Sequence, residues 1–170
     1  MENSEILGYS DASYAPVADD HKSTSAFFFI SNGAISWRSK KQPIISLSSM
    51  EAEYIALADA AKEGIWLNCL EKEIFPKNTP KVILLEDNQS TIKTAKNDII
   101  NERSKHIDVC YHFIHENIRA NKLEICYCST DWMVADALTK PLGCTKLELF
   151  VAEMGLVPIR ELTKIPLPHL

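Results

Sequence analysis

A long helical pattern, from Ser48 to about Ile74, separates three strand-like segments from a fourth that is almost wholly apolar. Ser48 and Glu51 have the spacing of a capping box, in which the serine oxygen and the glutamate carboxylate each accept a hydrogen bond from a free backbone N–H. The apolar segment Lys81–Glu86 is typical of a central strand in a parallel pair. Two parallel strands joined through a helix form a right-handed βαβ unit. The chain is therefore predicted to be an α/β domain.

The segments before the helix predict an antiparallel meander of three strands, at Ile6–Ser13, Thr24–Ser31 and Ala34–Ser39. Asn32 and Gly33 lie between the second and third strands, and both residue types accept positive φ, so the pair is a strong hairpin signal. The phenylalanine run at 27–29 is expected in the core, buried on both faces of the sheet.

The segments after the apolar strand predict a mainly helical second half. We expect helical stretches at Asn88–Asn97, Ile107–Asn121, Val134–Leu138 and Lys146–Met154, a polar loop at 98–105 and a last strand at Leu123–Ser129. The domain is expected to span residues 5–157. The proline-containing segment 158–170 is expected to be a loosely ordered C-terminal tail.

Composition indicates one ordinary globular domain. A chain of 170 residues can bury one sizeable core, and 46% hydrophobic with 24% charged residues is typical of a soluble protein. No apolar run approaches the ~18 residues that span a bilayer, and the acidic N-terminus is unlike a signal peptide. Five cysteines without a Cys-x-x-Cys pair favour reduced thiols. We expect an intracellular, non-secreted protein with no membrane partner; a cytoplasmic particle and the nucleus are not distinguished.

Four carboxylates occupy the middle of the first strand, the start of the long helix, the end of the apolar strand and the late helical stretch: Asp11, Glu53, Asp87 and Asp136. A lone Asp in a strand is usually only solvent-exposed, but four such positions form a pattern. Glu51 lies roughly 200° from Glu53 around the helix, so Glu51 is assigned to the cap and Glu53 to chemistry. Without the four, 23 − 4 = 19 acidic residues remain against 18 basic ones, which indicates no large basic face.

Eight short motifs follow one another along the chain: Gly8–Ala12, Asp20–Ser25, Gly33–Trp37, Ser39–Gln42, Leu47–Tyr54, Asp87–Ser90, Lys105–Asp108 and Ala135–Leu142. In this order and spacing, the chain resembles the ribonuclease H domain of the Pol polyprotein of copia-type LTR retrotransposons, from about Ile6 to Leu156. The order strand, hairpin, helix and strand predicts a mixed five-stranded sheet in the order 3-2-1-4-5, with helices on both faces, which is the ribonuclease H-like fold class that the resemblance implies.

The resemblance also implies a function and a metal site. The expected activity is endonucleolytic hydrolysis of the RNA strand of RNA·DNA hybrids during reverse transcription, with two Mg²⁺ ions, which Mn²⁺ can replace. Asp11 is expected to bridge both ions. Glu53 and Asp87 are expected to complete the ion on the leaving-group side, and Asp136 the ion that activates water. The expected partners are the hybrid and a reverse transcriptase domain of the same polyprotein.

One feature departs from the pattern of many ribonucleases H, which carry a mobile histidine in the loop before the last aspartate. The corresponding loop here, 129–133, has no histidine. His106 is the nearest candidate for a catalytic replacement, and a substrate or structural contact is the alternative.

Basic and polar residues within or near the motifs are the expected substrate contacts: Lys22, Ser23, Ser25, Arg38, Lys40, Asn88, Gln89, Arg103 and Lys105. Such groups can bind phosphates or the 2′-hydroxyl that distinguishes RNA from DNA. The three tryptophans are expected to be packing residues rather than stacking platforms. An alternative function is a catalytically inactive or co-opted copy of the fold that acts as an interaction module. The sequence leaves open whether the domain acts without a reverse transcriptase, its oligomeric state and its cleavage preference.

Overall fold

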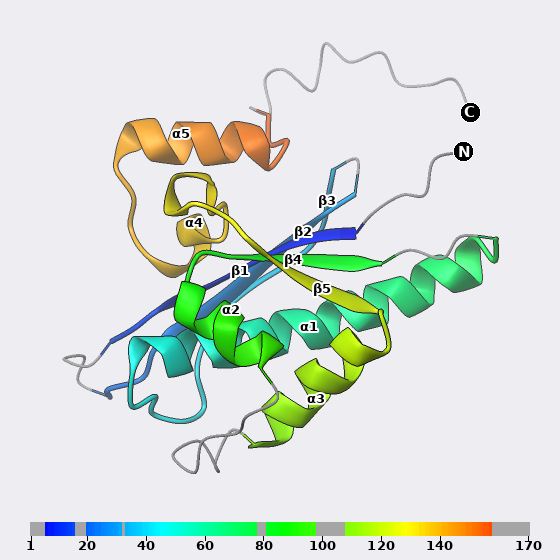
Figure 1. Ribbon diagram of the computed structural model, residues 1–170. Coiled ribbons are helices and arrows are strands. Elements are labelled where there is room, and N and C mark those ends of the chain that lie inside the picture. Colours follow the sequence, from blue (N-terminus) through cyan, green and yellow to red (C-terminus); the bar gives the residue numbers. More distant parts are fainter. Residues whose placement is uncertain (1–5, 16–19, 32, 78–80, 98–107, 158–170) are drawn as a thin grey trace.

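The computed structural model describes residues 6–15, 20–31, 33–77, 81–97 and 108–157 of the chain. Figure 1 shows one mixed sheet with α1, α2 and α3 on one face and α4 and α5 on the other. The strand order is β3-β2-β1-β4-β5. Both the predicted fold class and the predicted strand order are confirmed.

The predicted elements are all present, with ends that differ by a few residues. The strands are β1 (Ile6–Ser13), β2 (Thr24–Ile30), β3 (Ala34–Lys41), β4 (Val82–Glu86) and β5 (Leu123–Tyr127). The helices are α1 (Ser49–Ile74), α2 (Gln89–Lys96), α3 (Asp108–Arg119), the 3₁₀ turn η2 (Thr130–Trp132), α4 (Asp136–Thr139) and α5 (Cys144–Glu153). Asn32, the loop 98–105 and the tail 158–170 lie outside the described residues, so predictions made for them are not tested, and the domain limits stay a prediction.

Strand β1 lies at the centre of the sheet and pairs in both directions. It is antiparallel to β2, with Asp11 opposite Ala26, and parallel to β4, with Tyr9 opposite Leu85. Helix α1 connects the meander to β4, as the βαβ prediction required. Because β1 and β4 run in the same direction, their carboxyl ends meet at one edge of the sheet.

The phenylalanine run of β2 supplies both layers of the core. Phe27 and Phe29 belong to the cluster beneath α1, with Tyr54 and Leu84, whereas Phe28 packs on the other face with Phe150 of α5. Alternate side chains of a strand point to opposite faces, so a continuous apolar run fits a strand covered on both sides. The expected burial on both faces is confirmed.

The start of α1 has the predicted cap. The Ser48 hydroxyl accepts a hydrogen bond from the Glu51 N–H (3.2 Å), and the Glu51 carboxylate accepts one from the Leu47 N–H (3.0 Å). The glutamate reaches one residue beyond the N-cap, but its role is the predicted one. Helix α1 begins at Ser49, and Glu53, two residues after Glu51, lies near the end of β4 at the sheet edge.

The expectation for the tryptophans is wrong. Trp37, Trp66 and Trp132 are each more than half exposed, because they lie on the edge strand β3, on the outer side of α1 and in the turn η2. The five cysteines are free thiols. None of the described helices combines the length and the apolar composition needed to cross a bilayer.

Gly8 of β1 lies where side chains of the neighbouring strands β2 and β4 leave no room for a Cβ atom. A Cβ there would lie 2.4 Å from Phe29 Cε1 and 2.6 Å from Leu84 Cδ2. Overpacking of this kind costs about 1–3 kcal/mol. Gly8→Ala should therefore lower the melting temperature by roughly 2–12 °C, measured by circular dichroism.

Gly143→Ala is the matched control, because no atom lies within 4 Å of its Cβ position and its φ of −64° suits any residue. It should melt within about 2 °C of the wild type. Equal melting temperatures for the two variants would contradict the close packing at Gly8.

Candidate metal centre

The register of β1 and β4 places two carboxylates side by side. Tyr9 pairs with Leu85, and the same offset, continued by two residues, brings Asp11 opposite Asp87. Asp11 is buried, at 1% exposure, and Asp87, just beyond the end of β4, is half-buried. This is the edge of an α/β sheet at which functional sites form.

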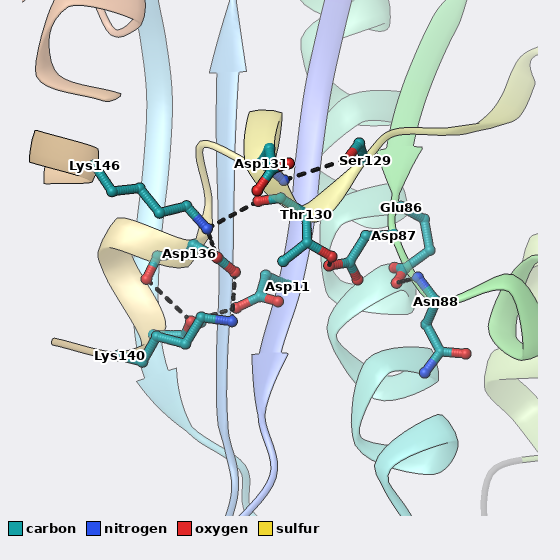
Figure 2. Close-up of polar contacts among 11 residues, drawn as sticks. Asp11, Glu86, Asp87, Asn88, Ser129, Thr130, Asp131, Asp136, Lys140 and Lys146 are labelled. Atoms are coloured by element: carbon teal, nitrogen blue, oxygen red, sulfur yellow. Dashed lines mark hydrogen bonds and ion pairs between the residues drawn. The ribbon is translucent and has the colours of Figure 1, made fainter. Parts of the chain in front are cut away.

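Helix α4 adds a third carboxylate to this edge. Asp136, its first residue, is fully buried. One carboxylate oxygen from each of Asp11, Asp87 and Asp136 lies within 4.8 Å of the others. Figure 2 shows these three carboxyl groups turned toward one another from β1, the end of β4 and α4. The three form a group that could share a cation.

A second group of three carboxylates contains Glu53 from α1 and Glu86, the last residue of β4, together with Asp87 again. Its oxygens also lie within 4.8 Å of one another. Both glutamates are buried. Asp87 is thus common to the two groups. The structure brings together all four carboxylates singled out from the sequence and adds Glu86, while their roles in catalysis stay a prediction.

Burial changes the protonation of this cluster. Desolvation raises the pKa of Asp11 to about 6, against the opposing effect of a hydrogen bond from Thr139. Desolvation, followed by the negative charges of Asp11 and Asp87, raises the pKa of Glu53 to about 9. The pKa of Glu86 is also raised well above its usual value, chiefly by burial and then by the charge of Glu53. Without a cation, the cluster therefore favours bound protons.

Two lysines that sequence reasoning missed neutralise Asp136. Lys140 Nζ lies 2.7 Å from Asp136 Oδ1, and Lys146 Nζ lies 2.9 Å from Oδ2. Lys140 is four residues from Asp136, a spacing that could have pointed to it. Lys146 reaches the site from α5, which no local signal indicates. Figure 2 shows both ammonium groups converging on Asp136.

Two threonine hydroxyls orient the other aspartates. Thr139 of α4 donates a hydrogen bond to Asp11 Oδ2, and Thr130 of η2 donates one to Asp87 Oδ2 (2.6 Å). Thr130 belongs to the loop in which many ribonucleases H carry a histidine. The predicted catalytic alternative to that histidine, His106, lies outside the described residues.

The donor set fits a hard divalent cation. All its candidate ligand atoms are carboxylate oxygens, which Mg²⁺ and Mn²⁺ prefer. Glu53 Oε2 is buried and has no hydrogen-bond partner among the described residues, although a buried carboxylate oxygen is costly when unpaired. A bound cation would satisfy that oxygen.

The predicted substrate contacts divide into surface, buried and undescribed residues. Lys40 and Gln89 are exposed and Lys22 is half-buried, and Arg38 pairs with Asp59 at 2.5 Å. Ser23 and Ser25 are buried, and Ser25 Oγ accepts a hydrogen bond from Gln42 (2.8 Å), so neither hydroxyl is presented at the described surface.

Asn88 has a structural task, and two other predicted contacts cannot be placed. The Asn88 side-chain oxygen caps α2 by accepting hydrogen bonds from the N–H groups of Ser90 and Thr91. Arg103 and Lys105 lie outside the described residues.

Sequence comparison relates the chain to segments of long polyproteins. It is 41% identical over 152 residues to the Retrovirus-related Pol polyprotein from transposon TNT 1-94 of Nicotiana tabacum, covering 89% of this chain and 11% of that polyprotein. It is 34% identical over 155 residues to the Retrovirus-related Pol polyprotein from transposon RE1 of Arabidopsis thaliana, covering 91% and 11%. The chain thus spans about a tenth of the length of these two relatives. No family model matches it.

Solved structures with the same fold include ribonucleases H. RNase H1 from Halobacterium salinarum NRC-1 superposes with a TM-score of 0.58 at 15% identity, covering 79% of this chain and 94% of that one. LC11-RNase H1 in complex with an RNA/DNA hybrid gives 0.57 at 14% identity, covering 79% and 94%. At these identities the likeness shows the fold.

Proposed function

Since this chain is a relative of one segment of the retrovirus-related Pol polyproteins, with the fold of ribonuclease H domains, we propose that it is an endoribonuclease that cuts the RNA strand of RNA·DNA hybrids. The proposal places it in the Pol polyprotein of a copia-type retrotransposon, acting during reverse transcription. The observation that carries the proposal is the convergence of carboxylates from β1, α1, β4 and α4 at one edge of the sheet.

Asp11, Glu53, Asp87 and Asp136 would bind two divalent cations, Mg²⁺ or Mn²⁺. Such ions, when bound, supply an activated water and stabilise the leaving oxygen of a phosphodiester. The expected bridging role of Asp11 stays a prediction. Asp87 is a second candidate for that role, because it is the residue common to both carboxylate groups.

The remaining polar residues of the site keep these carboxylates in position. Thr139 fixes the orientation of Asp11, and Thr130 that of Asp87. Lys140 and Lys146 compensate the charge of the fully buried Asp136, which would otherwise be unfavourable in a low-dielectric site. Positioning in advance of substrate binding is what a rigid catalytic constellation requires.

The substrate proposed is the hybrid, with the phosphate backbone contacted by exposed basic side chains. Lys22, Arg38 and Lys40 are the described candidates, with Gln89 at the start of α2. The net charge of −5 indicates that such contacts alone bind weakly. We therefore propose that a reverse transcriptase domain of the same polyprotein contributes to substrate binding.

The test uses the purified chain and an end-labelled RNA·DNA hybrid, with DNA·DNA and RNA·RNA duplexes of the same sequence as controls. We expect cleavage of the RNA strand of the hybrid with Mg²⁺ or Mn²⁺, no cleavage with EDTA, and intact control duplexes. Thermal melting with and without Mg²⁺ shows whether the metal centre is intact when no cleavage is seen. A rise in melting temperature with Mg²⁺ would indicate that the centre binds metal and that the substrate is bound too weakly. Absence of both cleavage and a Mg²⁺-dependent rise in melting temperature would favour the non-catalytic interaction module.

A further inference from the structure

Glu86 is an acidic residue at a position of β4 whose side chain points into the core. Val82, Leu84 and Glu86 alternate along β4 and are all buried, and the first two pack in the cluster beneath α1. Glu86 is fully buried. An acidic residue at such a position is costly unless its oxygens are satisfied.

Only one of the two Glu86 oxygens is accounted for. Oε1 accepts a hydrogen bond from the Asn88 N–H (3.1 Å), the contact visible beside Asp87 in Figure 2. Oε2 is buried and has no hydrogen-bond partner among the described residues. Glu53 Oε2 is in the same condition. A single partner between Glu53 and Glu86 would satisfy both of these oxygens.

The distances between the carboxylate oxygens of this second group fit a divalent cation bound between them. Oxygens of Glu53, Glu86 and Asp87 lie within 4.8 Å of one another, and two ligands on opposite sides of a Mg²⁺ ion at ~2.1 Å are ~4.2 Å apart. The three residues come from α1, β4 and the residue just after β4, so the group approaches one point from two elements. No arginine or lysine is paired with Glu53 or Glu86 in any ion pair of the described residues.

We propose that Glu86 is a fifth carboxylate of the metal centre and binds a divalent cation together with Glu53 and Asp87. This inference rests on the proposed function. It assigns one cation position to Glu53, Glu86 and Asp87 and leaves the other to Asp11, Asp87 and Asp136. The alternative is a proton shared between Glu53 and Glu86, with no metal contact by Glu86.

The experiment measures Mn²⁺ binding directly, by titration calorimetry and by the loss of the free-ion electron paramagnetic resonance signal. Glu86→Gln keeps the shape of the side chain and the acceptor for Asn88 N–H but removes the charge. We expect the wild type to bind two Mn²⁺ ions, and Glu86→Gln to bind one of them about 10–100-fold more weakly. The variant should melt no lower than the wild type in EDTA, because it removes an unpaired buried acid.

Glu51→Gln is the matched control, because Glu51 is also a buried glutamate at this end of the domain but accepts its hydrogen bond from Leu47 N–H. It should bind both ions with wild-type affinity. Glu86→Met, which offers no oxygen at all, is a second variant and should show at least the same loss of affinity as Glu86→Gln.

The outcomes separate this inference from the function on which it rests. If the wild type binds Mn²⁺ and cuts the hybrid while Glu86→Gln binds both ions like the wild type, the inference is wrong and the proposed function stands. A lower melting temperature in EDTA for both Glu86 variants, with unchanged Mn²⁺ affinity, would assign Glu86 to stability and also overturn it. If the wild type neither binds Mn²⁺ nor cuts the hybrid, the proposed function itself is wrong.

Discussion

Asp87→Asn should abolish cleavage of the RNA·DNA hybrid while leaving the domain folded. Asp87 is the carboxylate common to both three-residue groups, so the substitution removes a negative ligand from each. Loss of metal-dependent catalysis corresponds to several kcal/mol of barrier, and we expect a rate decrease of roughly 10³-fold or more. The side-chain oxygen of asparagine can still accept the Thr130 hydrogen bond, so the local structure should persist. Initial cleavage rates on a labelled hybrid measure the effect.

Asp131→Asn is the matched control, since Asp131 is an exposed aspartate of the neighbouring turn η2 and belongs to neither carboxylate group. It should cleave at a rate close to that of the wild type. In EDTA, Asp87→Asn should melt at a higher temperature than the wild type, because one of several mutually repelling carboxylates is gone. Added Mg²⁺ should stabilise the wild type more than Asp87→Asn. Cleavage by Asp87→Asn within tenfold of the wild type would contradict the assignment.

The fold could be predicted because its determinants are local. The capping pair Ser48 and Glu51 locates the start of α1, and the apolar run of β4 identifies a strand covered on both faces. The order of the strands, the hairpin and the helix along the chain then predicts the strand order in the sheet, which is confirmed. Element ends were less accurate: β3 continues to Lys41 and β5 stops at Tyr127, because strand ends depend on which neighbour offers a pairing partner.

The candidate site could be predicted only where a motif marks its residues. Asp11 and Asp87 lie side by side because β1 and β4 pair in parallel. The motifs around these two residues could indicate that pairing. Glu86 was missed because an acidic residue at the end of an apolar run is ordinarily a solvent-exposed strand end. Glu86 is buried because the start of α1 lies beside that end of β4. This is a feature of the tertiary structure that the local sequence does not show. The contact of Lys146 with Asp136 likewise depends on the position of α5.

The sequence does not show whether a hydroxyl residue near a motif is exposed or buried. Ser23 precedes β2 and Ser25 is its second residue, and both were predicted as substrate contacts because a hydroxyl group can bind a phosphate or a 2′-hydroxyl. In the folded domain Ser25 hydrogen-bonds to Gln42 between β2 and the segment leading to α1, and Ser23 accepts a hydrogen bond from Ala15 N–H. Both hydroxyl groups therefore hold β2 to neighbouring segments of the domain. They are buried because β2 is not an edge strand and is covered by its neighbours.

The stability of the metal-free domain should fall as pH rises, and Mg²⁺ should reverse this fall. The folded-state pKa of Asp11 is raised from 3.8 to about 6, and that of Glu53 from 4.5 to about 9. Between the unfolded-state and the folded-state pKa of each group, the folded state binds more protons than the unfolded state. The free energy of unfolding therefore decreases with increasing pH over this range. The stabilisation by these protons is complete below about pH 4 and is lost as pH passes through 6 and then 9. For Asp11, the difference between a pKa of 3.8 and one of about 6 corresponds to about 3 kcal/mol of unfolding free energy.

Thermal melting in EDTA and in Mg²⁺, from about pH 5 to about pH 9, measures this dependence. Bound cations require deprotonated carboxylates, so Mg²⁺ should raise the melting temperature most at high pH, and the two curves should converge toward pH 5. Glu53→Gln should flatten the decline in EDTA, because it removes the carboxyl group whose pKa is raised to about 9, while Glu51→Gln should keep the wild-type slope. A wild-type melting temperature in EDTA that rises between pH 5 and pH 9 would mean that the buried carboxylates are already compensated inside the protein. The lysine pair at Asp136 would then have to serve the whole cluster, and the cluster would have no need of a cation.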